Sequence, residues 1–444
     1  GYLGRASYSY DDRYFFTGSY RRDGASVFGV NQKWGDFFAF GGAWRLSSEK
    51  FMSSISYLDD LKLKVSWGKN GNQGLDPYGT LSTINNGASG GVRYEFGGSD
   101  IIYGLNQKAL GNANLGWETT ESWNTGFESA WLGSRLFVDL DLYFSKTTDQ
   151  IFTRDIPVMT GFKNMKSSMG QVNNRGVELT IRSVNINTQD WYWTTNLTFW
   201  LNRNKLVHLY GEDLNGDGKE DDDISNSRFI GKPLGAIYGY QQDGIVQETD
   251  IEYMKANGAT PGIPKYKDMD NDGVITSADR VILGYSTPNF KLNMSNTITY
   301  KNWDLYFMLT GTFGGGGYYQ KSNKGAYLTN GSGRFNTNGI YIPWWTPENK
   351  SNEYPAATFN DDGGRFLGLQ NRAFVRLHDV TLSYTFREPW VQKVNIQNLK
   401  VFFTAKNLFT ITKWQGGDPE VGVTVSENTY PVLTSFSLGA NISF

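Results

Sequence analysis

The sequence predicts an all-β protein, a transmembrane antiparallel β-barrel, and three observations lead to this fold class. Aromatic residues make up 15% of the 444 residues, glycine contributes 52, and the mean hydropathy is −0.47. No run of about 20 apolar residues occurs, so transmembrane helices are not expected. Apolar and polar residues alternate in segments along the whole chain. This combination is typical of strands that face lipid on one side and water on the other.

Composition also excludes several classes of function. The formal net charge of −2 argues against a nucleic-acid partner held by a basic surface. The chain has no cysteine, and therefore no disulfide, thiolate zinc site or cysteine nucleophile. Its two histidines, His208 and His378, are too few for a multi-histidine metal site. No arrangement of residues favours catalysis, so we do not expect an enzyme.

The strands are predicted from alternation with a period of two. Residues 135–144, RLFVDLDLYF, place their apolar side chains on one face and Asp139 and Asp141 on the other. Near Asp379 the phase of the alternation changes, which predicts a β-bulge. Thirteen strands are expected, near residues 2–10, 14–21, 36–46, 61–68, 117–131, 134–146, 175–184, 191–203, 290–300, 303–313, 374–386, 399–410 and 434–444.

The connections between these strands are expected to alternate between short and long. The short ones are residues 11–13, 47–60, 132–133, 185–190, 301–302 and 387–398. The long ones are residues 22–35, 69–116, 147–174, 204–289, 314–373 and 411–433. Short periplasmic turns and long extracellular loops are the rule for outer-membrane barrels. The last strand is therefore expected to end in the periplasm.

Alternation alone would also fit a soluble sandwich or propeller, but three features favour the membrane barrel. The long and short connections segregate to two sides. The final strand keeps its apolar row in phase up to the terminal residue, Phe444. Aromatic residues lie near strand ends, as interfacial girdles require. They are Trp44, Trp67, Trp117, Trp131, Trp191 and Trp303.

The number of strands bears on the organisation of the chain. Thirteen is odd, whereas single-chain bacterial barrels have an even number of strands. The sequence also opens at Gly1 in mid-pattern, without an initiator methionine or signal peptide. We therefore expect residues 1–444 to be the C-terminal part of a larger barrel, with an N-terminal plug and the first strands outside this chain.

An ordered set of motifs resembles the C-terminal half of the SusC/RagA family of TonB-dependent outer-membrane transporters. The motifs are YRRDGASVF at residues 20–28, KWG at 33–35, DDLKLKVSWGKNGNQ at 59–73, LGNANLGWETT at 110–120, NRGVEL at 174–179, IGKPLGAIYGYQQDGI at 230–245, WTPEN at 345–349 and KNLFT at 406–410. They cover nearly the whole chain, and none is decisive alone.

The resemblance implies a fold, a location and a set of partners. The fold would be a plugged barrel of about 22 strands, of which this chain holds the last thirteen, in a bacterial outer membrane of the Bacteroidetes type. The function would be TonB-powered import of a nutrient, oligosaccharide in preference to peptide, together with a SusD-like lipoprotein that lids the extracellular mouth. A non-energised structural or adhesive barrel, a siderophore or vitamin receptor, and a soluble carbohydrate-binding β-protein are the alternatives.

The sharpest local motif is DMDNDGVITSAD at residues 268–279, which matches an EF-hand-type calcium loop. Ca²⁺ binds six to eight oxygens, and alternate residues of a tight loop converge on one point. The predicted ligands are the side chains of Asp268, Asp270, Asp272 and Asp279 and the backbone carbonyl of Val274. Position twelve carries aspartate instead of glutamate, and no flanking helix is evident. We expect a weak, structural Ca²⁺ site in an extracellular loop.

A second acidic run, DLNGDGKEDDD at residues 213–223, begins in the same way. Asp213, Asn215 and Asp217 would be its first ligands. Position twelve is Ile224, so the pattern fails there unless Asp222 or Asp223 substitutes. A solvated acidic loop is the better interpretation of this run.

The cargo contacts are expected among aromatic residues of the long loops, because flat rings stack on sugar rings. The candidates are Tyr341, Trp344, Trp345 and Trp414. The alternative is that these side chains pack loop against loop or against the lid protein.

Overall fold

The computed structural model describes residues 1–86, 93–95, 101–162, 164–318, 343–356, 359, 369–393, 396–414, 418–420 and 432–444. The chain divides into two compact units. The first consists of Gly1–Leu179 and Asn202–Leu234, and the second of Thr180–Leu201 and Gly235–Phe444.

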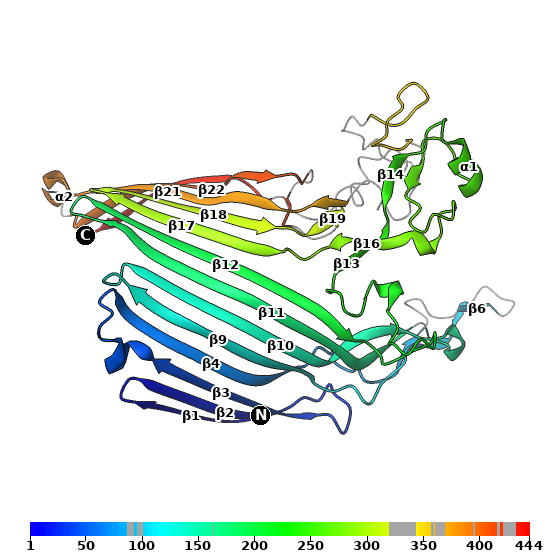
Figure 1. Ribbon diagram of the computed structural model, residues 1–444, viewed down its shortest axis with the longest axis horizontal. Helices are drawn as coiled ribbons and strands as arrows, with labels where there is room; N and C mark the ends of the chain where they lie inside the picture. Colours follow the sequence, from blue (N-terminus) through cyan, green and yellow to red (C-terminus); the bar gives the residue numbers. More distant parts are fainter. Residues whose placement is uncertain are drawn as a thin grey trace. The chain divides into compact units, whose positions relative to one another are not determined.

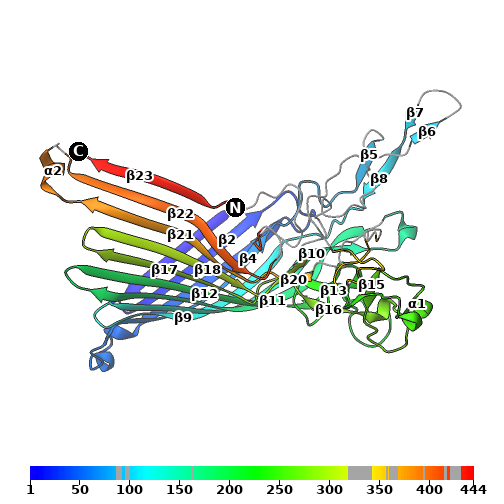
Figure 2. The same cartoon turned by 90° about the horizontal axis from the view of Figure 1, so that it is seen from above.

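Thirteen strands form one sheet in which each strand pairs with its neighbours in chain order, as the alternation predicts. Their bounds are β1 Tyr2–Tyr10, β2 Tyr14–Gly24, β3 Trp34–Arg45, β4 Leu58–Asn72, β9 Glu118–Trp131, β10 Leu136–Asp155, β11 Asn164–Asn187, β12 Trp191–His208, β17 Phe290–Tyr300, β18 Trp303–Phe313, β21 Phe374–Phe386, β22 Asn398–Thr412 and β23 Ser435–Ser443. Figures 1 and 2 show the strands within each unit side by side.

In the first unit the two faces of the sheet differ in polarity. Leu140 of β10 pairs with Phe127 of β9, and these side chains lie on the apolar face. On the opposite face, the ammonium of Lys64 lies 2.9 Å from Asp139 Oδ1 and 2.8 Å from Asp141 Oδ2. The polar face is therefore one on which charges are paired, and the apolar face is left exposed.

In the second unit the terminal strand likewise has an exposed apolar face. Leu438 of β23 pairs with Phe403 of β22, and the Phe403 ring stacks on Phe436 with 6.1 Å between centroids. Leu438 is 78% exposed, so this apolar row faces away from the protein. The predicted bulge is confirmed, because the register of β21 shifts between Leu377 and Asp379.

Several strands are longer than predicted. The β10 and β11 strands continue through most of the loop expected at residues 147–174, and only residues 156–163 separate them. About ten residues suffice for a transmembrane strand, so the 20 residues of β10 and 24 of β11 must extend beyond a bilayer. The alternation of apolar residues weakens there because water surrounds both faces, and the prediction therefore ended the strands too early.

The long loops contain secondary structure that the sequence analysis did not predict. Small two-stranded sheets pair β5 (Thr83–Asn86) with β8 (Leu105–Ala109), β6 (Arg93–Glu95) with β7 (Ile101–Tyr103), β13 (Ala236–Tyr240) with β16 (Arg280–Tyr285), β14 (Gln242–Ile245) with β15 (Pro264–Tyr266), and β19 (Gly316–Tyr318) with β20 (Leu369–Asn371).

The helices are few and short. The loops and turns carry α1 (Ile251–Asn257), α2 (Pro389–Lys393) and the 3-10 turns Leu46–Ser48, Lys50–Met52, Val158–Thr160, Ile224–Asn226 and Ser277–Asp279. In the second unit, α2 lies at one end of the strands, whereas α1 and the sheets β13–β16 and β14–β15 lie at the other (Figures 1 and 2). Across the described residues, none of the helices has the length and apolar character needed to cross a membrane.

Candidate functional site

The acidic loop at residues 268–279 brings together three of its four predicted carboxylate ligands. Oxygens of Asp268, Asp270 and Asp279 lie within 4.8 Å of one another. Asp272 lies outside this group, and its Oδ1 accepts the N–H of Val274 at 2.8 Å. The sequence analysis missed α1, which precedes the loop; its last residue, Asn257, accepts the N–H of Ile275.

The charges in this loop are partly compensated by the backbone. Asp279 is fully buried and accepts the N–H groups of Thr276 and Met269, each at 2.7 Å. These amides hold the pKa of Asp279 below its usual range. The backbone N–H of Asp272 lowers the pKa of Asp270, but desolvation and the charges of Asp272 and Asp279 outweigh it and raise this pKa. The donor set of three converging carboxylates fits a hard cation such as Ca²⁺.

The second acidic run folds in the same way as the first. In both loops the side chain at position one accepts the N–H of position six, three accepts that of five, and five accepts that of seven. Position six is a glycine with φ of 88° at Gly273 and 80° at Gly218, a conformation that other residues rarely adopt. Among the described residues, only the first loop gathers three carboxylates within 4.8 Å.

The acid that closes the second loop is Asp221. Its Oδ2 accepts the N–H of Leu214 at 2.6 Å, as Asp279 accepts the N–H of the second residue in the first loop. Asp222 instead accepts the N–H of Ile230 at 2.6 Å, and Asp223 binds Arg228. The structure thus places neither of the two acids considered in the sequence analysis at the end of the loop; the equivalent residue occurs three positions earlier than the motif requires.

Asp223 fastens the second loop to the long strand β10. Its Oδ2 lies 3.1 Å from Arg228 Nη1 and 3.1 Å from the Tyr210 hydroxyl, and Arg228 also donates to the Thr153 carbonyl. Burial and the charge of Asp223 raise the pKa of Tyr210 to about 12. Burial raises the pKa of Asp223 as well, but hydrogen bonds from Ser225, Asn226 and Tyr210 outweigh it and lower this pKa overall.

The segment at residues 343–356 docks on the β14–β15 sheet. Trp345, 8% exposed, donates its indole N–H to Gln247 Oε1 at 3.0 Å and packs with Ile245. Gly262 has φ of 90°, and a Cβ there would lie 2.6 Å from the Trp345 ring, so this contact requires glycine. Two long loops are thereby joined into one body.

The predicted cargo aromatics differ in their placement. Trp345 and Trp414 are buried, at 8% and 5% exposure, so their rings contact protein. Trp344 is half-buried, and its carbonyl accepts the side-chain amide of Asn349. Tyr341 lies outside the described residues. Burial of two of these rings favours the packing role over direct stacking on a sugar.

Part of the last loop is held by ion pairs with the buried Arg376 of β21, of which the pair with Asp418 is itself buried and the pair with Glu420 is half-exposed. Arg376, 3% exposed, lies 2.7 Å from Asp418 Oδ1, and its Nη1 pairs with Glu420 at 2.5 Å. Arg372 donates to the Pro419 carbonyl at 2.9 Å. Residues 418–420 are therefore fixed against the polar side of the sheet.

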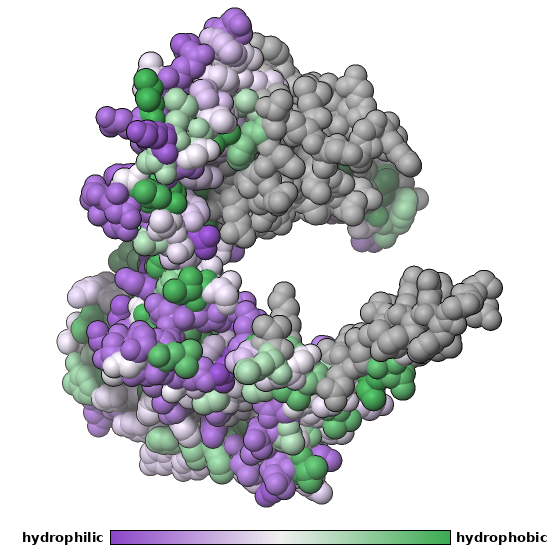
Figure 3. Space-filling view, turned by 90° about the vertical axis from the view of Figure 1, so that its right-hand side faces the viewer, coloured by the Kyte–Doolittle hydropathy of each residue, from purple (hydrophilic) through white to green (hydrophobic). Residues whose placement is uncertain are grey.

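Hydrophilic residues predominate over much of the coloured surface in Figure 3, which looks onto the loop ends of the strands.

The sequence profile of the family described as TonB dependent receptor-like, beta-barrel matches residues 1–408. The chain belongs to this family. The receptor is 29% identical to TonB-dependent receptor P3 of Formosa agariphila, over 100% of this chain and 45% of that protein. It is 30% identical to TonB-dependent receptor SusC of Bacteroides thetaiotaomicron, over 100% of this chain and 43% of that protein.

The fold of the receptor is also that of a solved transporter. The structure described as the RagAB peptide transporter superposes with a TM-score of 0.80 at 24% identity, over 100% of this chain and 47% of that one. The chain thus spans less than half the length of the relatives it matches. It is of the SusC/RagA type, its place is the bacterial outer membrane, and its family consists of transport proteins rather than enzymes.

Membership in this family indicates which face of the sheet contacts lipid and which lines the interior. The exposed apolar face contacts lipid, and the face that carries Lys64 and Asp139 lines the interior. The turns at residues 11–13 and 301–302 are periplasmic by the same rule, and the acidic loops are extracellular.

We predict that acid opens the attachment of the second acidic loop. The lowered pKa of Asp223 means that its ion pair stabilises the fold above the unfolded carboxyl range of about 4 and is lost as the pH falls below it. Hydrogen exchange, corrected for intrinsic rates, should show the amides of Asp223 and Arg228 losing protection progressively as the pH falls below about 4 and through the lowered pKa of Asp223.

Two variants control this experiment, both measured with chelator present. Asp223→Asn should expose these amides already at neutral pH. Asp217→Asn changes a carboxylate of the same loop that pairs with no cation among the described residues, and should behave like the parent. Protection in the parent that stays equal from pH 6 down to about pH 2 would contradict this account.

Proposed function

We propose that the receptor imports neutral oligosaccharides across the outer membrane, powered through a TonB complex and assisted by a SusD-like surface lipoprotein. The observation that carries the proposal is the family match over residues 1–408, together with 30% identity to SusC along the whole chain. The SusC/RagA resemblance implies the lid, the TonB complex and a plug region that contacts it.

The chemistry of the interior face supports a neutral, hydroxyl-rich cargo. Lys64 is surrounded by the carboxylates of Asp139, Asp141 and Glu128, so its charge is compensated before a ligand arrives. Elsewhere on this face neutral groups bond to one another, as in the 2.9 Å contact between the Tyr143 hydroxyl and Asn202 Oδ1. Such groups can donate to and accept from sugar hydroxyls, whereas an anionic chelate would require uncompensated cations.

Peptide import is the second candidate function. The observation that favours it is the shared fold with the RagAB structure, which is described as a peptide transporter. A peptide could satisfy the same neutral groups through its backbone amides. Sugar and peptide must therefore be separated by experiment.

Growth of a strain that lacks the receptor tests the proposal. We expect growth on a panel of neutral oligosaccharides as sole carbon source to fail for at least one member, while growth on peptides and under iron limitation is unchanged. Loss of growth on peptides alone would indicate that the cargo is a peptide. A defect only under iron limitation would indicate a siderophore receptor.

Energy coupling separates an importer from an adhesive barrel. Uptake of the labelled oligosaccharide should stop when a protonophore collapses the gradient that drives TonB, while surface binding persists. Uptake that is insensitive to the protonophore, or binding without uptake, would contradict TonB-dependent import. The SusD-like lipoprotein should co-purify with the receptor in mild detergent. Failure of the lipoprotein to co-purify would contradict its proposed role as the lid.

We also propose that Ca²⁺ binds the loop at residues 268–279 and fixes the extracellular body built on β14–β15. The supporting contact is the convergence of Asp268, Asp270 and Asp279 within 4.8 Å. A cation there would neutralise the repulsion that raises the pKa of Asp270. Asp213, Asn215 and Asp217, with Asp221 as the closing acid, are a second and weaker proposal.

Protease resistance of the loop measures calcium binding. About 1 mM Ca²⁺, the range of weak extracellular sites, should slow cleavage near residues 268–279 relative to chelator, because a ligand that binds only the folded loop stabilises it. The double variant D268N/D270N should lose this difference. The matched control Asp243→Asn, a carboxylate on β14 outside the group, should keep it. Identical cleavage of the parent with Ca²⁺ and with chelator would remove the site.

A further inference from the structure

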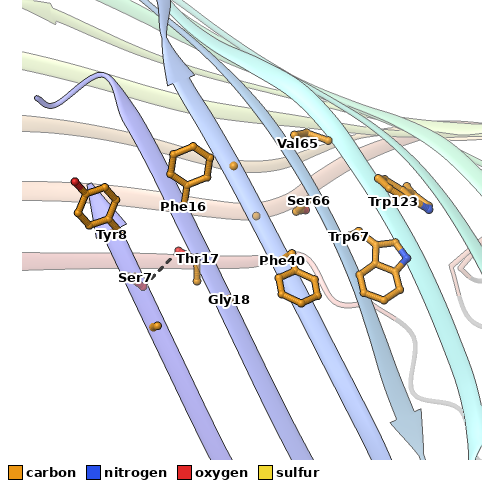
Figure 4. A pocket seen from close by; sticks show the side chains of 13 residues that line it. Ser7, Tyr8, Phe16, Thr17, Gly18, Phe40, Val65, Ser66, Trp67 and Trp123 are labelled. Carbon is orange, nitrogen blue, oxygen red and sulfur yellow. Dashed lines mark hydrogen bonds between the residues drawn. The ribbon is translucent and has the colours of Figure 1, made fainter. Parts of the chain in front are cut away.

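An apolar groove of about 620 Å³ crosses the lipid-facing side of β1, β2, β3, β4 and β9 in the first unit (Figure 4). Its walls are aromatic and its floor is made of small residues. On the lipid-facing side it is lined by Ala6, Tyr8, Phe16, Gly18, Phe40, Gly42, Val65, Trp67 and Trp123.

The register of the strands explains this shape. In one row across the sheet, Gly42 lies between Phe16 and Val65. In the next row, Gly18 lies between Ala6 and Phe40. Gly42 is thus flanked by larger side chains on both sides and Gly18 by a ring on one side, and Phe40 continues the wall through its stack on Trp67, 6.0 Å between centroids.

The fold itself does not require the two glycines of the floor. Neither has a positive φ, and a Cβ at Gly18 would meet the Phe40 ring at an ordinary 3.5 Å. A Cβ at Gly42 would have no neighbour closer than 3.9 Å. Glycine weakens a strand and often marks a place where another molecule approaches closely. The empty space above Gly18 and Gly42 is therefore not required by the backbone conformation or by close packing within the sheet.

The groove is continuous with the lipid-facing surface of the receptor, so the hydrocarbon chains of membrane lipids contact it. It spans four strand spacings of about 4.8 Å, or about 19 Å, comparable to the ~15 Å depth of one hydrocarbon leaflet. Stable protein partners bury at least about 1,200 Å² in total, and the aromatic walls enclose only a narrow trough.

The position of the groove indicates the leaflet. Tyr8 and Phe16 lie two residues from the ends of β1 and β2 at the periplasmic turn 11–13. Beside this turn, Phe51 is 63% exposed and meets the Trp44 ring edge-on at 6.5 Å, as in an interfacial girdle. The near end of the groove therefore begins just inside the periplasmic interface.

We propose that this groove is a binding site for one acyl chain of a phospholipid from the periplasmic leaflet. The chain lies on Gly18 and Gly42 between the rings of Phe16 and Phe40. The site rests on the outer-membrane location of the receptor and is independent of its cargo, so loss of import would leave it unaffected.

Filling the groove is the direct test. The receptor is purified from its own outer membrane in mild detergent, and bound phospholipid is counted by native mass spectrometry. The double variant G18L/G42L should retain at least fivefold less phospholipid than the parent. The matched control Gly4→Leu lies on the same face of β1 outside the groove, where a Cβ meets nothing within 4 Å, and should retain as much as the parent. Equal retention by all three proteins overturns the proposal.

A labelling experiment checks the location without a variant. Phosphatidylethanolamine that carries a photoactivatable group on its acyl chain is reconstituted with the parent receptor and irradiated. Label should concentrate on peptides that contain Phe16 and Phe40 relative to those that contain Phe403 and Leu438, which are equally lipid-facing. Uniform label indicates bulk lipid only, and weaker label on the peptides with Phe16 and Phe40 indicates that something other than this lipid covers the groove; either result overturns the proposal.

Discussion

The structure depends on one constraint: a strand inside hydrocarbon must find partners for all its backbone N–H and C=O groups on neighbouring strands. Water cannot satisfy them there, so the strands pair continuously, each with the next in the chain. Once pairing is fixed, successive side chains must point to opposite faces. Lipid meets one face and the interior the other, and this division places Leu438 outside and Lys64 inside.

The same constraint governs the exceptions. Asn296 lies on the lipid-facing side, opposite Phe307, yet it is only 4% exposed. Its Oδ1 accepts the Thr195 hydroxyl at 2.7 Å and the Trp193 indole N–H at 2.9 Å. A polar group can remain at this depth because it is hydrogen-bonded and covered. Outside the bilayer the constraint ends, and the loops fold by buried clusters such as Arg376 with Asp418.

The sequence could predict the sheet because period-two alternation directly reflects the two environments. The predicted bulge at Asp379 and the terminal strand follow from the same signal. The docking of Trp345 on Gln247 could not be predicted, since it joins residues 98 positions apart and follows no period. The loop sheets and α1 consist of strands of a few residues and one short helix, which are too short to give a clear period.

The candidate site was predicted in part for similar reasons. The local spacing of Asp268 and Asp270 identified a loop whose carboxylates converge. Spacing failed for Asp221, because backbone geometry and not position number decides which acid closes the second loop. The lipid-facing groove carries no sequence motif at all; it exists only because the register brings Gly18 beside Phe40.

The orientation of the terminal strand tests the central claim most directly, and the absence of cysteine from the chain makes the test simple. Single cysteines are introduced at residues 436–441 of β23, and outer-membrane fragments with an accessible periplasmic side are treated with a water-soluble maleimide. We predict slow labelling at positions 436, 438 and 440, which face lipid, and fast labelling at positions 437, 439 and 441, which face the interior. Equal labelling at all six positions would contradict a strand that separates lipid from water.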